Sequence, residues 1–389
     1  MAIVQNSAAL LQMFARRGAE SLQALRSEIT NPHEVKTLRM WGIQEAARMV
    51  DRSPPTLKKA ELEFPELQPA RDVAGRRAYD LALINKYRDK LGSRYRRPDG
   101  SRPIVCAVTN FKGGAGKSTT AVHLAQRAAL DGLRVLAIDL DPQATFTLHF
   151  GIIPDLDLDP SDTISHALVV NPADLSEKIV STYFPGLDLA PANLGLQDAE
   201  LQLANRDENN ESVLGLGPID RLRAALDSVQ GQYDVVLLDC GPNLGVLTLN
   251  AINSATGLLI PIPPQMPDFG SARQFFESMS QLLRNPRFAR PLDFVKVLIS
   301  RHTGTTEASK VEALMRINFG EAVMQQVALE SVEVERASNA FAGIYESAAR
   351  GTEAYERAYR SIDGAMSELI ATFRSTWEAQ ALASSVVRA

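Results

Sequence analysis

The sequence predicts an α/β protein in which a mostly parallel β-sheet is covered by helices on both faces, preceded by a small α-helical domain of the winged helix-turn-helix type. An apolar run rich in β-branched residues occurs at residues 104–109, residues 257–262 and 294–300 also have the pattern of buried strands, and segments with helical periodicity separate them. Such runs are typical of parallel strands that are buried on both faces. Ahead of them, residues 34–98 contain two short helical patterns and a glycine turn.

The first predicted strand runs directly into a glycine-rich loop, NFKGGAGKS, at residues 110–118. Backbone N–H groups of such a loop surround phosphate oxygens, while Lys117 reaches the β- and γ-phosphates and the Ser118 hydroxyl holds Mg²⁺. Residues 119–130 have helical spacing, so a helix N-terminus faces the phosphates. The nucleotide-binding candidates are Lys112, Gly113, Gly114, Ala115, Gly116, Lys117, Ser118 and Thr119.

Carboxylates follow two later apolar runs. One run ends in Asp139 and Asp141, and the other ends in Asp239. The carboxyl ends of parallel strands meet at one edge of a sheet, where ligands of open α/β folds bind. Asp239 matches the Walker B position, so Asp239 and Ser118 are the main candidates for a magnesium site.

Composition limits the class of protein. The chain has 389 residues, of which 45% are hydrophobic, so it can bury substantial cores in two or three domains. We find no apolar stretch of roughly 18 residues that would span a bilayer, and no signal-peptide pattern at the N-terminus. Cys106 and Cys240 lie in or beside predicted strands and are expected to be buried, reduced thiols. The five histidines lack metal-ligand spacing, and the sequence favours a cytoplasmic location.

The charge of the chain is unevenly distributed. Its net value of −5 argues weakly against nucleic-acid binding. However, residues 34–102 contain sixteen Lys or Arg and ten Asp or Glu, an excess of six positive charges, which leaves −11 on the remainder. A basic region beside an acidic one is typical of a DNA-binding module.

A helix-turn-helix pattern lies within this basic region. Residues 43–50 are predicted to form a short amphipathic helix, and Ser53 and Pro54 supply the N-cap and first-turn proline of a second helix at residues 54–63. Residues 75–79 are expected to form a β-turn or wing. The DNA-binding candidates on the second helix and the wing are Thr56, Lys58, Lys59, Arg76 and Arg77. The alternative is a helical dimerisation domain with a solvated basic face.

The patterns divide the chain into segments. These are a helical dimerisation arm at residues 1–33, the helix-turn-helix domain at 34–98, a linker at 99–103 and the P-loop domain at 104–389. The arm is inferred from apolar spacing in residues 7–28, which have no obvious partner inside the chain. Residues 353–378 are expected to form a closing helix, and Arg360, Asp363 and Glu368 interrupt its apolar face, which disfavours a membrane anchor.

The glycine-rich loop departs from the standard P-loop, because Phe111 replaces its first glycine and Lys112 adds a second lysine. Together with HLAQ at residues 123–126, AIDLDPQA at 137–144 and TYFPGLDLAPAN at 182–193, this loop resembles the ParA/MinD class of ATPases, which have a deviant P-loop. Within that class, the whole chain is similar to the ParA-type plasmid partition ATPases that carry an N-terminal helix-turn-helix domain, in particular the RepA group encoded in repABC operons.

This resemblance implies a homodimer that holds two ATP molecules between its subunits and hydrolyses them slowly, with Lys112, Lys117 and Asp141 as catalytic residues. Lys112 is expected to cross the interface to the partner's nucleotide, Asp141 to orient the attacking water, and Asp139 to lie in the outer shell of the magnesium ion. The resemblance further implies non-specific binding to nucleoid DNA, stimulation by a ParB-type centromere-binding protein, and repression of its own operon through residues 56–59. We see no arginine finger in cis, which agrees with slow hydrolysis.

Two other interpretations use the same nucleotide site. In the first, the protein is chiefly a nucleotide-controlled transcriptional regulator. In the second, it is a MinD-like positioning ATPase, and the C-terminal helix and the basic N-terminal module disfavour this second interpretation. The sequence does not determine which residues of the P-loop domain bind non-specific DNA. Candidates in the C-terminal half are Arg301, Lys310, Arg316 and Arg336.

Overall fold

The computed structural model describes residues 2–29, 36–205, 216–288, 290–347 and 350–388, and its contacts divide the chain into two units, residues 1–37 and 38–389. The first unit contains the long helix α1 (Ala2–Ile29). Leu10, Leu11 and Phe14 are exposed on this helix. The helix predicted at residues 7–28 is therefore confirmed, while its self-association stays a prediction.

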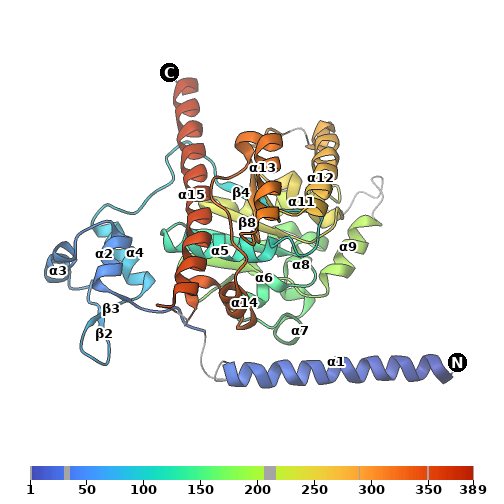
Figure 1. Cartoon of the computed structure of the whole chain (residues 1–389), viewed down its shortest axis with the longest axis horizontal. Helices are drawn as coiled ribbons and strands as arrows, with labels where there is room; N and C mark the ends of the chain where they lie inside the picture. The colour runs from blue at the N-terminus through green and yellow to red at the C-terminus, as the bar shows by residue number, and fades with distance from the viewer. Residues whose placement is uncertain (1, 30–35, 206–215, 289, 348–349, 389) are drawn as a thin grey trace. The chain divides into compact units, whose positions relative to one another are not determined.

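The second unit is built around a seven-stranded sheet. Its strands are β4 (Ile104–Val108), β5 (Val135–Leu140), β6 (Val180–Ser181), β7 (Leu187–Ala190), β8 (Val235–Cys240), β9 (Gly257–Ile262) and β10 (Phe294–Ile299). The order across the sheet is β10-β9-β4-β8-β5-β7-β6. Figure 1 shows the central strands β4 and β8 surrounded by helices. Neighbouring strands are parallel, except that β6 pairs antiparallel with β7 at one edge. The mostly parallel sheet predicted from the apolar runs is confirmed.

Helices cover both faces of this sheet. They are α5 (Lys117–Leu130), α6 (Thr145–His149), α7 (Pro154–Asp157), α8 (Ile164–Val169), α9 (Leu196–Ala204), α10 (Arg221–Val229), α11 (Val246–Ser254), α12 (Met266–Arg284), α13 (Thr306–Phe319), α14 (Val332–Asn339) and α15 (Glu353–Arg388). Alternate residues of the central strand β4 face two separate hydrophobic cores. Ile104, Cys106 and Val108 pack in the core that contains α5 and α15, and Val105 and Ala107 pack in the core that contains α8 to α13.

Residues 41–90 form a small domain, the winged domain, that contains short helices and a three-stranded sheet, while its identity as a helix-turn-helix stays a prediction. Its elements are β1 (Trp41–Gly42), α2 (Ile43–Val50), α3 (Pro54–Glu63), β2 (Ala70–Arg71), β3 (Arg77–Tyr79) and α4 (Leu81–Lys90). The Ser53 side chain accepts a hydrogen bond from the Thr56 N–H and caps α3, with proline in the first turn, as the sequence predicts. The three strands form an antiparallel sheet in the order β1-β3-β2, and the turn between β2 and β3 contains Gly75 at a φ of 72°. That φ is in the left-handed region, which favours glycine.

The winged domain is joined to the end of the P-loop helix α5. Arg88 on α4 is buried and donates hydrogen bonds to the Met49 carbonyl (2.9 Å), to Asn85 (2.7 Å) and to the Leu130 carbonyl at the end of α5 (2.7 Å). Arg94 donates to the carbonyl of Gly132 just beyond it (2.7 Å). A C-terminal helix end is where cationic side chains are favourable, because the last carbonyls have no partner within the helix.

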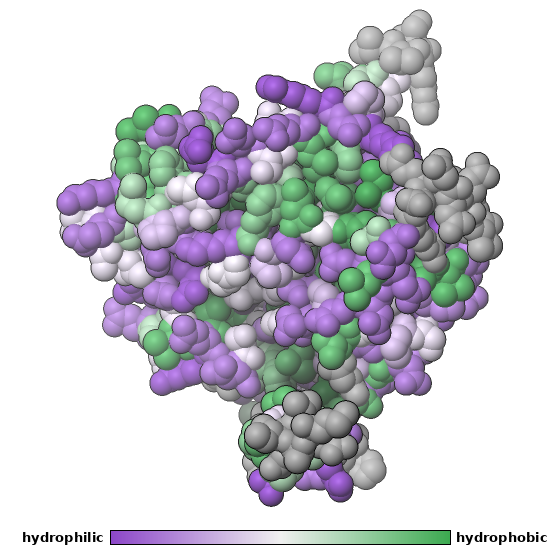
Figure 2. Space-filling model, turned by 90° about the vertical axis from the view of Figure 1, so that its right-hand side faces the viewer, coloured by the Kyte–Doolittle hydropathy of each residue, from purple (hydrophilic) through white to green (hydrophobic). Residues whose placement is uncertain are grey.

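Residues 99–103 form an irregular segment against α15. The Trp377 indole N–H donates to the Arg102 carbonyl (3.1 Å), and the Ser384 hydroxyl donates to the Gly100 carbonyl (2.8 Å). These contacts accompany a helix that continues to Arg388, ten residues beyond the predicted end at 378. In the part of the chain that the structure describes, no helix is both long enough and apolar enough to cross a membrane. On the face in Figure 2, hydrophobic patches are interrupted by hydrophilic residues.

Candidate nucleotide-binding site

The glycine-rich loop connects β4 to α5 and is braced by later parts of the sheet. The Ser300 hydroxyl donates to the Ala115 carbonyl (2.8 Å), and Arg301 donates to the Gly114 carbonyl (3.2 Å). Gly114 and Gly116 have φ values of 76° and 83°, in the left-handed region that favours glycine. The loop is therefore held open at the N-terminus of α5, the position where a helix binds phosphate groups.

The two lysines of the loop are close to each other along the chain but differ in environment. Lys117, the first residue of α5, is buried and donates from Nζ to the Lys112 carbonyl (3.1 Å). Burial lowers the pKa of Lys117, and the nearby Asp239 and Asp141 carboxylates oppose this shift. The Lys112 side chain is 37% exposed, and its Nζ lies 2.7 Å from a carboxylate oxygen of Asp268.

Strand register brings the predicted carboxylates to the loop. Val108, the last residue of β4, is paired with Asp239, and Asp239 is in turn paired with Asp139 on β5. Asp239 is buried, and among the described residues neither of its carboxylate oxygens has a hydrogen-bond partner. Burial and the neighbouring Asp139 raise its pKa, whereas the Ser118 hydroxyl and Lys117 lower it. A buried carboxylate without a partner beside a hydroxyl fits a hard divalent cation such as Mg²⁺.

Asp139 and Asp141 have different surroundings although they are two residues apart. Asp139 is buried and accepts hydrogen bonds from the Asp141 N–H (3.1 Å), the Thr147 N–H (2.8 Å) and the Thr147 hydroxyl (2.8 Å). Burial raises the pKa of Asp139, and the bonds from Thr147 oppose the shift. Asp141 is half-buried and accepts from the Gln143 N–H (3.0 Å). Asp139 thus fixes the turn that carries Asp141, which leaves Asp141 as the more accessible carboxylate.

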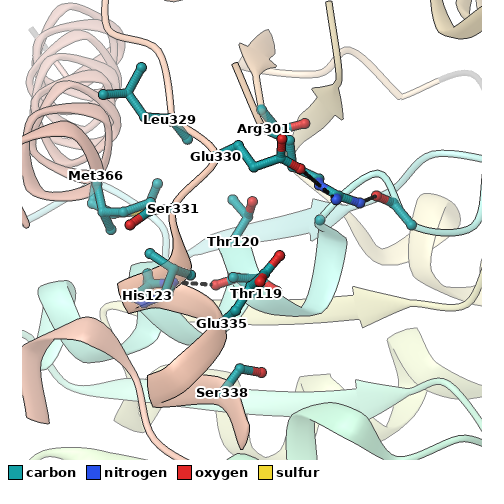
Figure 3. A pocket seen from close by; sticks show the side chains of 16 residues that line it. Thr119, Thr120, His123, Arg301, Leu329, Glu330, Ser331, Glu335, Ser338 and Met366 are labelled. Carbon is teal, nitrogen blue, oxygen red and sulfur yellow. Dashed lines mark hydrogen bonds and ion pairs between the residues drawn. The ribbon is translucent and has the colours of Figure 1, made fainter. Parts of the chain in front are cut away.

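A pocket of about 300 Å³ adjoins the loop. Thr119 and Thr120 of α5 lie on one side of it, and the segment 328–338 lies on the other (Figure 3). Arg301 and Glu330 line this pocket and form an ion pair with each other (2.6 Å). Arg301 has a φ of 51°, a left-handed conformation that is uncommon outside glycine and concentrates at functional sites.

The sequence patterns did not indicate this pocket. Its far wall is formed by the segment 328–338, which is roughly two hundred positions from the loop and carries no recognisable motif. Arg301, a candidate for DNA binding, instead contacts the P-loop and Glu330. Its place after β10 was a usable signal, because ligands in open parallel sheets bind at the carboxyl ends of strands.

The DNA-binding candidates are divided between exposed and paired side chains. Lys58 and Lys59 are exposed on α3. Arg76 is exposed on the wing and pairs with Asp72 (2.8 Å). Thr56 shares a hydrogen bond with Ser53, and Arg77 pairs with the buried Glu61 at 2.8 Å. DNA contacts by these five residues stay a prediction, and Lys58 and Lys59 are the freest to make them.

Two of the other three basic candidates also have local roles, whereas Lys310 is exposed. Arg316 donates to the carbonyls of Met324 and Gln325 (both 3.1 Å), and Arg336 pairs with Glu333 (2.7 Å). Contacts of these two arginines with DNA would compete with bonds inside the subunit.

The loop, the buried lysine and the carboxylates at the ends of adjacent parallel strands define a P-loop nucleotide-binding site. Comparison with known proteins identifies the family. A family model described as an AAA domain matches residues 104–288. Replication protein A of Sinorhizobium fredii is 36% identical over 374 residues, which cover 92% of each chain. The chromosome partitioning protein ParA of Caulobacter vibrioides is 30% identical over 274 residues, which cover 66% of this chain and 93% of that protein. The chain belongs to the ParA-type family of partition ATPases.

Solved structures agree with the fold. One described as a partition protein has a TM-score of 0.67 at 22% identity, with 92% of this chain and 99% of that chain covered, which supports the fold alone. Cobyrinic acid a,c-diamide synthase from Mycobacterium smegmatis, crystallised with an ATP analogue and magnesium, has a TM-score of 0.52 at 28% identity, with 63% of this chain and 91% of that chain covered. The α/β P-loop fold predicted from the sequence is confirmed.

Proposed function

We propose that the protein is a Mg²⁺-dependent ATPase that segregates plasmid DNA. The observation that carries this proposal is the convergence of a two-lysine P-loop with the unpartnered carboxylate of Asp239 at the ends of adjacent strands. Phosphoryl transfer to water requires mainly positioning and charge neutralisation, and these groups provide both. The magnesium-bound ATP analogue in the related synthase supports the choice of ATP.

The phosphates are proposed to bind at the N-terminus of α5, with Lys117 at the β- and γ-phosphates. Ser118 and Asp239 hold Mg²⁺, which neutralises charge on the phosphate oxygens when it is bound. The adenosine part of ATP extends into the pocket beside Thr119 and Arg301, whose volume is at the lower end of those known for ligand sites. Asp141 orients the attacking water, and Asp139 holds the backbone that carries Asp141.

Two subunits are proposed to enclose two ATP molecules, each subunit contributing Lys112 to the nucleotide of its partner. The partial exposure of this side chain supports such a role, since a fully buried lysine could not leave its subunit. The exposed apolar residues of α1 support a second, nucleotide-independent contact between copies through residues 1–33. We further propose that turnover is slow and is stimulated by DNA and a ParB-type centromere-binding protein.

We propose that the winged domain spans residues 34–98 and binds operator DNA. Helix α3 would lie in the major groove, and the wing would contact the adjacent phosphates. Repression of its own operon follows from this assignment. Non-specific DNA binding by the ATP-bound dimer places the protein in the cytoplasm on the nucleoid. Residues 99–103 then connect the operator-binding domain to the ATPase domain, residues 104–389.

A second candidate function is transcriptional control in which nucleotide only selects operator binding. The bonds from Arg88 and Arg94 to the end of α5 favour it, because they connect the DNA-binding domain directly to the nucleotide helix. A MinD-like positioning role is less well supported, since Arg360, Asp363 and Glu368 interrupt the apolar face of α15 that would have to lie on a membrane.

The deciding experiment measures phosphate release from ATP by the full chain alone, with random-sequence DNA, and with DNA plus the purified ParB-type protein from the same operon. The proposal expects low basal turnover that rises with both additions, while the Lys117→Ala variant stays inactive throughout. Turnover no greater than that of Lys117→Ala under every condition would exclude an ATPase. ATP-dependent binding to operator DNA but never to random DNA would favour the regulator.

A further inference from the structure

The second lysine of the loop is held by a buried carboxylate of its own subunit. Asp268 lies in the first turn of α12, and its side chain is only 4% exposed. Its carboxylate lies 2.7 Å from Nζ of Lys112, which is a short, direct ion pair. The first turn of a helix is a favourable position for a negatively charged side chain, so the place of Asp268 on α12 suits its pairing with a lysine.

The backbone on either side of Lys112 is held as firmly as its side chain. The Lys112 N–H donates to the Asn110 side chain (3.1 Å), and its carbonyl accepts from Lys117 (3.1 Å). The ring of Phe111 packs edge-to-face on Phe275 of α12, with ring centroids 4.7 Å apart. The first part of the P-loop is therefore attached to α12 by an aromatic contact as well as by the ion pair.

We infer that Asp268 is a positioning residue that retains Lys112 within its own subunit until an ATP-bound partner takes it over. This inference rests on the proposed dimer, in which Lys112 reaches the partner's nucleotide. In this proposal Nζ leaves its position 2.7 Å from Asp268 to reach the phosphates across the interface, so dimerisation exchanges one negative partner for another. The exchange leaves the nearly buried Asp268 without its cation, which opposes dimerisation because an unpaired buried charge is unfavourable.

The inference predicts the direction in which neutralising Asp268 changes the stability of the dimer, and this direction is opposite to the one that a purely supportive role predicts. If the carboxylate only helped to build the site, its removal would weaken the dimer. If it competes with the partner's phosphates, its neutralisation strengthens the dimer and lowers the ATP concentration at which the dimer forms. The short pair, the low exposure of Asp268 and the partial exposure of Lys112 favour competition.

The test compares Asp268→Asn with the wild type by sedimentation velocity over a series of ATP concentrations, in an Asp141→Ala background that slows hydrolysis. Asparagine keeps the size of the side chain and removes its charge. We expect the ATP-dependent dimer of Asp268→Asn to form with a dissociation constant about tenfold lower, as for loss of an opposing charge interaction. Glu277→Gln is the matched control, because Glu277 is on the same helix but exposed and paired with Arg273.

A double-mutant cycle separates positioning from a general effect on α12. With Lys112→Ala also present, Asp268→Asn should have no effect on dimerisation, because the residue it holds is gone. Asp268→Glu should restore the wild-type dissociation constant at least in part. A Lys112-independent effect of Asp268→Asn, an unchanged dimer or a weaker dimer would each overturn the inference.

A second measurement uses the wild-type chain and does not depend on how the variants fold. A zero-length carbodiimide reagent should join Lys112 to Asp268 within one subunit in the absence of nucleotide, detectable as a crosslinked peptide pair by mass spectrometry. The crosslink should be lost when the non-hydrolysable analogue AMPPNP is added, and its persistence would overturn the inference. A wild type that stays monomeric with AMPPNP would overturn the proposed dimer itself, whereas a dimeric wild type that keeps the crosslink would overturn only the role of Asp268.

Discussion

The buried histidine of the P-loop helix should make the stability of the protein depend on pH. His123 lies on α5, with Nδ1 2.7 Å from the Thr119 carbonyl oxygen and Nε2 accepting a hydrogen bond from the Ile344 N–H (2.9 Å). These partners require the neutral ring, with the proton on Nδ1, because the Ile344 N–H needs an acceptor. Burial lowers the pKa of His123 to about 4, although the bond to Thr119 acts in the opposite direction.

The direction of the pH effect on stability follows from the difference between the pKa of His123 in the folded state and in the unfolded state. In the unfolded chain His123 has an ordinary pKa of 6.5, so on acidification the unfolded state takes up the proton before the folded state does. The contribution of His123 to stability is complete above pH 6.5 and is lost progressively as the pH falls from 6.5 toward 4. Between pH 7.5 and pH 5 this loss amounts to about 2 kcal/mol of unfolding free energy.

Urea unfolding of the wild type and of His123→Gln at pH 7.5 and pH 5.0 measures this contribution. Glutamine offers an acceptor for the Ile344 N–H but does not titrate. Other carboxyl and histidine groups contribute equally to both proteins, so they cancel in the comparison. The wild type should lose about 2 kcal/mol more than the variant on acidification. Equal losses in the two proteins would refute the assignment of His123 as a buried neutral group.

Four further predictions concern the proposed function. Lys117→Ala should weaken ATP binding at least about 100-fold, since the phosphates lose their main cation, and unchanged affinity by isothermal titration would contradict that role. Asp141→Ala should keep ATP binding and dimerisation while phosphate release falls by about 100-fold or more, and normal release would remove its assigned role. Lys112→Ala should weaken the ATP-dependent dimer about tenfold or more by analytical ultracentrifugation, and a dimer as tight as wild type would argue against cross-interface contact. Lys58→Ala and Lys59→Ala should each lower the salt dependence of operator binding by about one unit in a logarithmic plot, measured by fluorescence anisotropy, and slopes equal to wild type would show that α3 does not contact phosphates.

Local sequence was sufficient for the elements that carry the phosphate-binding loop. Residues 104–109 predict a buried strand because the five side chains of residues 104–108 are all apolar, and β4 is indeed flanked by two cores. The turn to α3 was equally clear, since serine followed by proline specifies a helix start by local hydrogen bonding. Asp139 and Asp239 are adjacent because parallel strands end at the same edge of the sheet, so the motif order alone predicted their convergence.

Contacts between distant segments could not be predicted in this way. Asp268 has no local pattern that distinguishes it from other carboxylates in first helical turns, and only the fold places it beside Lys112. Arg77 illustrates the same limit, because its position in a basic stretch favoured an outward orientation. Its guanidinium instead pairs with Glu61, which the short sheet brings close. Sequence periodicity specifies which face of an element is buried, but not which polar group lies opposite.

The attachment of Arg88 and Arg94 to the end of α5 has a mechanical consequence. This helix has 14 residues and is therefore about 21 Å long, with triphosphate proposed at one end and the winged domain hydrogen-bonded to the other. A helix of this length is stiff. A tilt at its phosphate end would therefore displace the carbonyls at its other end, to which Arg88 and Arg94 donate hydrogen bonds. Under the proposed function, nucleotide binding at one end of α5 would therefore change the angle of the winged domain at the other end through these hydrogen bonds.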